Sequence, residues 1–334
     1  MAAAFALLVI VFGAFVRLSN AGLSCPDWPT CYGQITWPTH ASDIASANAA
    51  FPDRPVESDK AWREQVHRIL VGGLGILTFA LAGWAGWRRR DLGALAWVPI
   101  AAAGLIFFQA ALGAWTVSMK LLPAVVTAHL LGGIGMFALL AYTALRLSVA
   151  PAGSAAGISA VEKTRLRRLV GLGLGLVATQ IALGGWTSTN YAALSCGLDF
   201  PGCLGEAWPR ADFREAFVLW RGVGVNYEGG VLDGSARIAI QLVHRMGALV
   251  VFGFLATTVI ARGVRHAQTR NYALLVAAAL LLQVALGIAN VRLGLPLPLA
   301  TAHNAGAALL LLALLALLVR ARPADAGAPT WRPA

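Results

Sequence analysis

Long runs of apolar residues alternate with polar stretches along the whole chain. A helix needs about 20 apolar residues to span a bilayer, and segments of roughly that length recur through the sequence. We predict eight transmembrane helices, at about residues 2–17, 64–87, 92–118, 124–147, 166–189, 237–261, 270–291 and 299–320. The pattern therefore predicts an all-α integral membrane protein.

The first apolar segment is shorter than the others and begins at Met1. It runs from Ala2 to Val16 and straight into Arg17, with no basic region before it and no small-residue cleavage site after it. These features disfavour a signal peptide. We expect a retained helix, and its true start stays open.

Composition supports the membrane class, and charge adds an orientation. The 334 residues are 58% hydrophobic and 12% charged, with a net charge of +11. The stretches after the second, fourth, sixth and eighth segments carry 14 of the 26 Lys and Arg residues but only three of the 15 acids. Such basic loops face the cytoplasm. Both termini are therefore expected there, and the long loops at about 18–63 and 190–236 on the outer side.

All four cysteines fall in those two loops, as Cys25 and Cys31 in the first and Cys196 and Cys203 in the second. Their close spacing on an oxidising side of the membrane favours two local disulfides. A metal site is the rival, although five residues between cysteines is not a usual zinc spacing. Whether the disulfides are structural or redox-active is open.

The second half of the chain repeats the first. The string Gln109–Trp115 recurs at Gln180–Trp186 and in part at 283–287. Four segments per half is an even number, so both halves enter the membrane in the same direction. We expect two pseudo-symmetric four-helix bundles. The expected parts are an N-terminal half at 1–150, a cytoplasmic linker at 151–165, a C-terminal half at 166–322 and a cytoplasmic tail at 323–334.

Four histidines share one predicted depth near the outer face. The motifs are Glu64-Gln-Val-His67-Arg68 and Thr127-Ala-His129 in the first half, and Gln241-Leu-Val-His244-Arg245 and Thr301-Ala-His303 in the second. Ionisable residues inside membrane segments need a specific partner. One buried histidine alone is more often a hydrogen-bonded core residue, but two pairs on neighbouring helices supply the axial ligands of two haem irons. Zinc or copper is less favoured, because no further donors converge at that depth.

Both histidine pairs lie toward the same face, so two haems would sit side by side rather than form a relay across the bilayer. Arg68 and Arg245 each follow a candidate ligand directly. They could pair with haem propionates, and lipid headgroups are the equal alternative. His40 and His266 lie in predicted loops, and we interpret both as surface residues.

One polar position distinguishes the two copies: Glu64 in the first corresponds to Gln241 in the second. Glu64 precedes His67 by three residues, so the two share a helix face. A carboxylate there could accept protons or capture an oxidised carbon of the macrocycle. A helix-start residue matching the helix dipole is the plain alternative. The difference suggests that the first site performs chemistry and that the second holds a cofactor.

Together these residues resemble the heme A synthase family. Besides the histidine motifs, the resemblance is carried by Gly13-Ala-Phe-Val-Arg17-Leu-Ser-Asn-Ala-Gly22-Leu-Ser-Cys25-Pro-Asp-Trp28-Pro-Thr-Cys31, and it spans about residues 13 to 310. It implies an oxidoreductase that oxidises the C8 methyl of haem O to a formyl group, with oxygen from water. The product, haem A, serves terminal oxidases. The lack of an Arg/Ser-rich transit region before the first segment favours a bacterial inner membrane over a mitochondrion. The departure from the family is the short N-terminus.

The resemblance also implies roles for individual residues. Glu64 matches the family's catalytic acid, and His67 and His129 match the ligands of the substrate haem O. His244 and His303 match the ligands of a haem b. The pairs Cys25–Cys31 and Cys196–Cys203 match the cysteines of the two outer loops. A farnesyltransferase that makes haem O and a terminal oxidase under assembly are the expected partners, and self-association into a homo-oligomer stays open.

Two other functions remain alternatives. A di-haem electron carrier linked to quinol would bind haem b at both pairs and perform no chemistry on it. A haem-handling oxidase-assembly factor would insert haem without oxidising it. The Glu64/Gln241 difference disfavours both.

Overall fold

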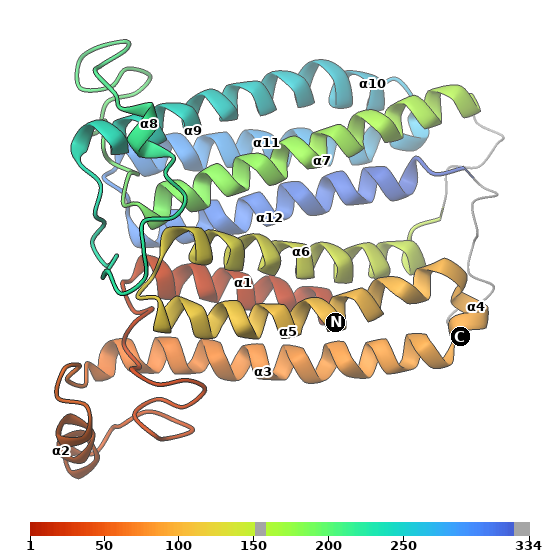
Figure 1. The fold of residues 1–334 in the computed structure, drawn as a ribbon. Coiled ribbons are helices and arrows are strands. Elements are labelled where there is room, and N and C mark those ends of the chain that lie inside the picture. The colour runs from red at the N-terminus through yellow and green to blue at the C-terminus, as the bar shows by residue number, and fades with distance from the viewer. Residues whose placement is uncertain (151–157, 324–334) are drawn as a thin grey trace.

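The computed structural model describes residues 1–150 and 158–323 (Figure 1). The regular secondary structure of these residues is helical, apart from isolated bridges that join Cys31 to Gln34 and Cys203 to Glu206. The long helices run alongside one another, and the two long loops lie at the same end of them. We call this the loop end.

Seven helices of the described residues are long and apolar enough to cross a membrane. They are α3 (Ser58–Trp87), the run Arg89–Ser118 that ends in α5 (Trp97–Ser118), α6 (Pro123–Ser148), α7 (Ala160–Thr189), the run Gly234–Gly263 that begins with α9 (Gly234–Phe254), α11 (Ala267–Arg292) and α12 (Leu297–Arg320). The apolar helix α1 (Ala2–Leu18) is shorter, with 17 residues. The all-helical membrane class is thus confirmed, whereas a count of eight spans stays an expectation.

Several boundaries differ from those expected. Helix α7 begins inside the expected linker, because the hydroxyl of Ser159 caps it by accepting the N–H of Glu162 at 3.1 Å. The rest of that linker, 151–157, and the tail from 324 onward lie outside the described residues. The loops contain two short helices that the apolar pattern did not predict, α2 (Ala41–Ala50) and α8 (Phe213–Ala216).

Two of the membrane runs change their winding on the side away from the loop end. The run into α5 starts with α4 (Arg89–Leu92) and the 3-10 turn η1 (Gly93–Ala96). Helix α9 continues into the π-helical turn η2 (Leu255–Ile260) and α10 (Ala261–Gly263). The hydroxyl of Thr257 donates to the carbonyl of Gly253 at 2.7 Å, which is a common local competitor of the helix ladder.

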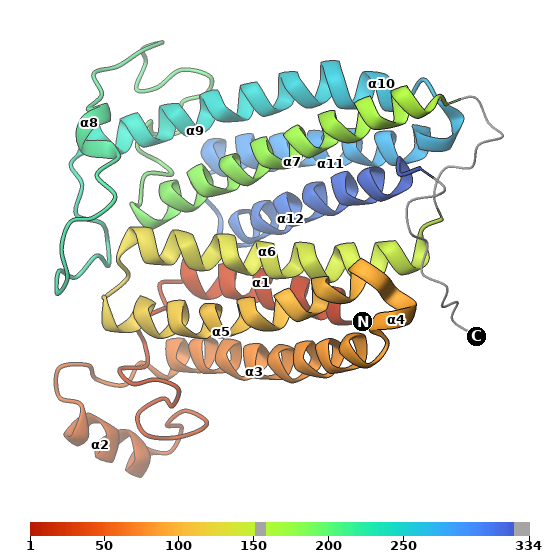
Figure 2. The same cartoon turned by 45° about the vertical axis from the view of Figure 1, so that its right-hand side comes forward.

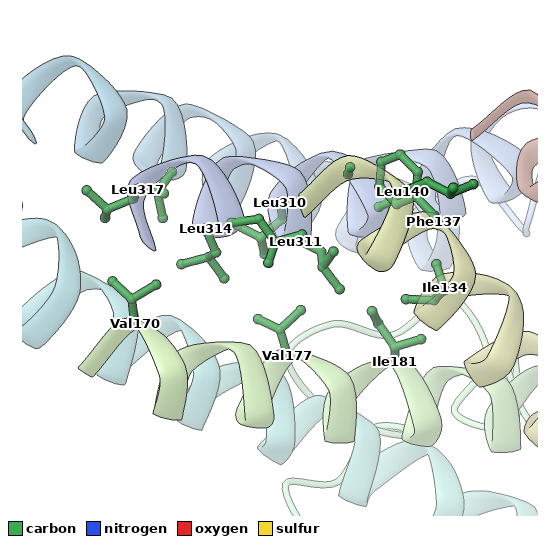
Figure 3. Close-up of a cluster of buried hydrophobic side chains, with 14 of the residues drawn as sticks. Ile134, Phe137, Leu140, Val170, Val177, Ile181, Leu310, Leu311, Leu314 and Leu317 are labelled. Atoms are coloured by element: carbon green, nitrogen blue, oxygen red, sulfur yellow. The ribbon is translucent and has the colours of Figure 1, made fainter. Parts of the chain in front are cut away.

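Helices from the first and second parts of the chain form two groups that lie side by side (Figures 1 and 2). The groups meet along α1, α6, α7 and α12. A large buried cluster fills this seam, with Phe137 and Leu140 from α6, Val177 from α7 and Leu314 from α12 (Figure 3). Dispersion between closely packed side chains is what holds membrane helices together. Helix α3 lies outside the seam, and its apolar stretch is the least buried of the seven.

At the loop end, polar contacts also join the two groups. Arg17 at the end of α1 donates to the hydroxyl of Tyr191 at 3.2 Å and to the carbonyl of Ser188 at 2.9 Å. The second long loop crosses to the first group, where the N–H of Tyr227 donates to the carbonyl of Lys120 at 3.1 Å. The buried ring of Tyr227 packs among leucines of the first group, including Leu23, Leu121 and Leu122.

Candidate functional site

All four histidines of the repeated motifs lie near the loop end, within the first eleven residues of α3, α6, α9 and α12. They interact electrostatically in two pairs, His67 with His129 and His244 with His303. The structure therefore brings together the same partners that the sequence motifs paired.

Each histidine ring packs against a glycine of the membrane helix that precedes its own. Any larger residue would bring a β-carbon toward Cε1 of the ring, so glycine provides the space for the imidazole. The pairs, with the distance that such a β-carbon would have to Cε1, are Gly13–His67 (2.8 Å), Gly287–His303 (3.1 Å), Gly184–His244 (3.3 Å) and Gly113–His129 (3.5 Å).

The ring nitrogens leave donor capacity unused. Nδ1 is buried and lacks a hydrogen-bond partner among the described residues in His67, His129 and His303. A buried imidazole nitrogen without a partner is costly, and a group that binds the ring offsets that cost.

The donor set fits a haem iron. A porphyrin supplies four nitrogens to its iron, so the protein need only add two axial ligands, as each histidine pair does. Within residues 1–150 and 158–323, no group of three or more His, Cys, Asp or Glu side chains is arranged to hold a metal ion by itself. Each pair is therefore suited to a metal that arrives with most of its ligands already attached.

Glu64 is buried, with 5% of its surface exposed, and faces the first disulfide loop. Its Oε2 accepts the hydroxyl of Ser24 at 3.0 Å and the N–H of Cys25 at 2.9 Å. Its Oε1 accepts a hydrogen bond from the guanidinium of Arg68 at 2.6 Å. Donors on both oxygens fix the carboxylate one helical turn from His67.

The two arginines that follow ligands each bind a disulfide loop. Arg68 donates to the carbonyls of Asp27, at 2.8 Å, and Thr30. Arg245 donates to the carbonyls of Gly202 at 2.6 Å and Asp199 at 2.9 Å. Both arginines thus hold a loop over their own half, a role that the sequence did not indicate.

Each loop is closed by a disulfide, Cys25–Cys31 with an S–S distance of 2.02 Å and Cys196–Cys203 with 1.99 Å. In the first loop, Asp27 organises the turn. Burial raises the pKa of its carboxyl, but hydrogen bonds from the Thr30 hydroxyl and the N–H groups of Gly33 and Tyr32 outweigh this effect, so the pKa lies below its usual value. The carboxylate therefore stabilises the loop in its ionised form.

The second half lacks the carboxylate network. Gln241 is also buried, yet its Oε1 has no hydrogen-bond partner within the described residues. The loop there is held by Arg245 without an acidic partner on its own helix. The Glu64/Gln241 difference is thus a difference in how the helix binds the loop as well as in charge.

Sequence reasoning missed the polar side chains that support the histidines. Ser24 lies 40 residues from Glu64 in the sequence, so only the fold brings them together. Gln109 donates to the carbonyl of His129 at 3.2 Å, and Gln180 to that of His244 at 2.9 Å. The recurrence of these glutamines in the repeated string was the available signal. Of the other two histidines, His40 is exposed and His266 is half-buried, and each precedes the first residue of a helix.

Comparison with known proteins gives a consistent result. The sequence profile of the COX15-CtaA family, described as cytochrome oxidase assembly protein, matches residues 1–315. The chain is 43% identical over 292 residues to the heme A synthase of Shewanella oneidensis, covering 87% of this chain and 86% of that protein. It is 25% identical over 293 residues to the heme A synthase of Bacillus licheniformis, covering 85% and 82%. For that of Paracoccus denitrificans, the identity is 28% over 316 residues, covering 85% and 76%.

Proposed function

The chain belongs to the COX15-CtaA family of cytochrome oxidase assembly proteins, and on this premise we propose that it is a heme A synthase. It would be an oxidoreductase that converts the C8 methyl of haem O to a formyl group. The observation that carries the proposal is the pair of glycine-packed histidine sites, of which only the first has a buried carboxylate one turn away.

The overall reaction determines which species the protein must bind and release. A methyl group and one water become a formyl group, four protons and four electrons. Binding the substrate near the loop end places the reacting group where water and protons can pass. We assign haem O to His67 and His129, because Glu64 belongs to that half. We assign a resident haem b to His244 and His303, which would supply reversible one-electron chemistry when bound.

Glu64 is the residue we assign to catalysis. Ser24, Cys25 and Arg68 hold its carboxylate in place. A fixed negative charge near the edge of the substrate stabilises positive charge that develops at the methyl carbon, and it can take up protons released there. Arg68 and Arg245, at the same level as the ligands, are assigned to the haem propionates through the N–H groups that the loop carbonyls leave free.

The architecture we propose is two pseudo-symmetric four-helix halves, residues 1–150 and 166–322. Equivalent backbone features in the two loops support it. In each loop a residue in the left-handed conformation follows the second cysteine, at Tyr32 and Leu204, and a bridge joins that cysteine to the residue three positions later. We place the protein in a bacterial inner membrane with both termini cytoplasmic, because the basic clusters lie away from the loop end. A haem O-producing farnesyltransferase and a terminal oxidase are its proposed partners.

The test is to extract the haems bound to the purified protein, expressed with and without a source of haem O. Haem A or a hydroxylated haem O that appears only with that source supports the synthase. Haem b alone under both conditions would favour the electron carrier.

Glu64→Gln gives the first site the residue of the second, so haem A should disappear while haem O remains bound. Gln241→Glu is the matched control and should leave the yield of haem A unchanged. A normal yield of haem A from Glu64→Gln would remove Glu64 from the mechanism.

A further inference from the structure

Three of the four histidine helices share a second contact, one turn deeper than the ligand. In each, a glutamine from the preceding helix lies on a glycine three residues after the histidine. A β-carbon at any of these glycines would overlap with the glutamine side chain. The pairs are Gln109 on Gly132, Gln180 on Gly247, and Gln283 on Gly306.

Each glutamine also contacts its histidine, Gln109 through the main-chain carbonyl of His129, to which its Nε2 donates at 3.2 Å. Nε2 of Gln180 lies 3.1 Å from Nδ1 of His244 and donates to the main-chain carbonyl of His244 at 2.9 Å. Nε2 of Gln283 lies 3.4 Å from Nε2 of His303. The Oε1 atoms of all three glutamines are buried and have no hydrogen-bond partner in the part of the chain that the structure describes. Each of these carboxamides therefore lies beside a histidine with its nitrogen toward it, while its oxygen is left without a partner.

An imidazole that gives one nitrogen to a metal carries its proton on the other. That N–H is normally donated to a nearby acceptor, which fixes the ring and increases its strength as a ligand. The nitrogen and oxygen of a carboxamide have similar positions, so a half-turn would present Oε1 to the ring in place of Nε2, in exchange for the hydrogen bond that Nε2 of Gln109 or Gln180 donates to a histidine carbonyl. After such a turn, the Oε1 atoms of Gln180 and Gln283 could accept the N–H that His244 and His303 would have as ligands, while Gln109 fixes His129 through its main-chain carbonyl.

His67 is the exception, and both sides of the contact differ. Val9 takes the place of the glutamine four residues before Gly13, and Leu70 takes the place of the glycine three residues after His67. Instead, the ring of Phe12 lies 6.5 Å from that of His67 at an interplanar angle of 27°. An aromatic ring packs well but accepts no strong hydrogen bond.

We propose that Gln109, Gln180 and Gln283 are positioning residues that hold three histidines as haem ligands, and that His67 is built as the releasable ligand. The inference rests on the proposed haem ligation. The second pair, with a glutamine on both ligands, keeps its haem permanently. The first pair holds its haem firmly through His129 and exchanges it past His67. A synthase needs this asymmetry, because its substrate must enter and its product must leave.

The test installs the missing contact. Val9→Gln combined with Leu70→Gly gives His67 the arrangement of the other three ligands. Val9→Leu combined with Leu70→Ala is the matched control, which changes the same positions without supplying an acceptor. Each purified protein is loaded with two equivalents of haem b, and transfer of haem to apomyoglobin is followed by absorbance.

The natural chain should release haem in a fast and a slow phase. Loss of a partner of a metal ligand changes metal affinity about 10- to 100-fold. The Gln/Gly variant should slow the fast phase by that factor, whereas the control variant should not slow it. An unchanged fast phase in the Gln/Gly variant, with the slow phase intact, would overturn the inference. Fewer than two haems bound per chain would instead count against the proposed function.

A second measurement separates positioning from simple packing. Gln180→Leu removes the acceptor beside His244 and should raise the midpoint potential of the second haem, because a less electron-rich imidazole stabilises the ferric state less. Gln180→Glu keeps an acceptor and should not raise it. Equal potentials in Gln180→Leu and the natural chain would overturn the assignment of the glutamines.

Discussion

Replacing glycine by alanine at two positions of the first site would add the same methyl group where different amounts of space are available. A methyl group at Gly13 would lie 2.8 Å from Cε1 and 3.2 Å from Nε2 of His67, whereas one at Gly113 would lie 3.5 Å from Cε1 of His129. Non-bonded carbon atoms rest about 3.5–4.0 Å apart. The added methyl group of Gly13→Ala therefore overlaps with the imidazole of His67 by about 0.7 Å. The methyl group of Gly113→Ala makes an ordinary contact with the imidazole of His129.

The overlap sets the expected size of the effect. Overpacking of this kind costs about 1–3 kcal/mol, and each 1.4 kcal/mol changes an equilibrium by about tenfold. We expect Gly13→Ala to weaken haem binding at the first site roughly 5- to 150-fold. We expect Gly113→Ala to leave binding unchanged and to stabilise α5 by up to about 1 kcal/mol, because alanine is the better helix former.

The assay is a titration of purified protein with haem b, followed by the Soret band, with the second site as the internal standard. Gly72→Ala is the control, because it lies on the helix of His67 and a β-carbon there would meet nothing within 4 Å. Equal losses for Gly13→Ala and Gly113→Ala would refute the argument that glycine makes room for the ligand. So would unchanged binding in Gly13→Ala.

Two further predictions concern the first loop. Because the pKa of Asp27 is lowered below 3.8 on folding, its stabilisation of the loop is present above pH 3.8 and lost as the pH falls through the lower, folded value. Pepsin cleavage of this loop should therefore accelerate as the pH falls below 3.8, and Asp27→Asn should remove the acid-dependent step; an unchanged profile in Asp27→Asn would contradict the assignment. Ser24→Ala removes one donor to Glu64 at 3.0 Å and should weaken loop docking by about 1–3 kcal/mol. Dithiothreitol should then reduce Cys25–Cys31 faster with the rate at Cys196–Cys203 unchanged, and equal acceleration at both disulfides would indicate general unfolding instead.

The membrane class, the approximate helices and the pairing of histidines could be predicted from the sequence. Apolar length and motif repetition are local properties, and the depth of a residue such as His129 follows directly from the position of its helix. Helix ends could be placed less well, because they depend on single caps. Ser159, whose hydroxyl begins α7 several residues early, is an example.

The surroundings of Glu64 could not be predicted, because its partners come from a loop folded back over the helix. The sequence places Glu64 on the face of His67, but only the fold shows that both carboxylate oxygens bind Ser24, Cys25 and Arg68. The position of Tyr227 is a similar case. It belongs to the second long loop, yet it packs on the first group of helices, far from its neighbours in sequence.

The position of α3 outside the seam has a consequence for the physical setting of the enzyme. His129 and His303 are on helices packed in the centre of the molecule, whereas His67 is on α3, whose apolar stretch is the least buried of the seven described membrane runs. Under the proposed assignment haem O binds beside this helix, so the bilayer would be both the reservoir of this apolar substrate and the wall beside its site. Acyl-chain order and bilayer thickness would then be determinants of turnover, acting on the outer helix while His129 stays fixed.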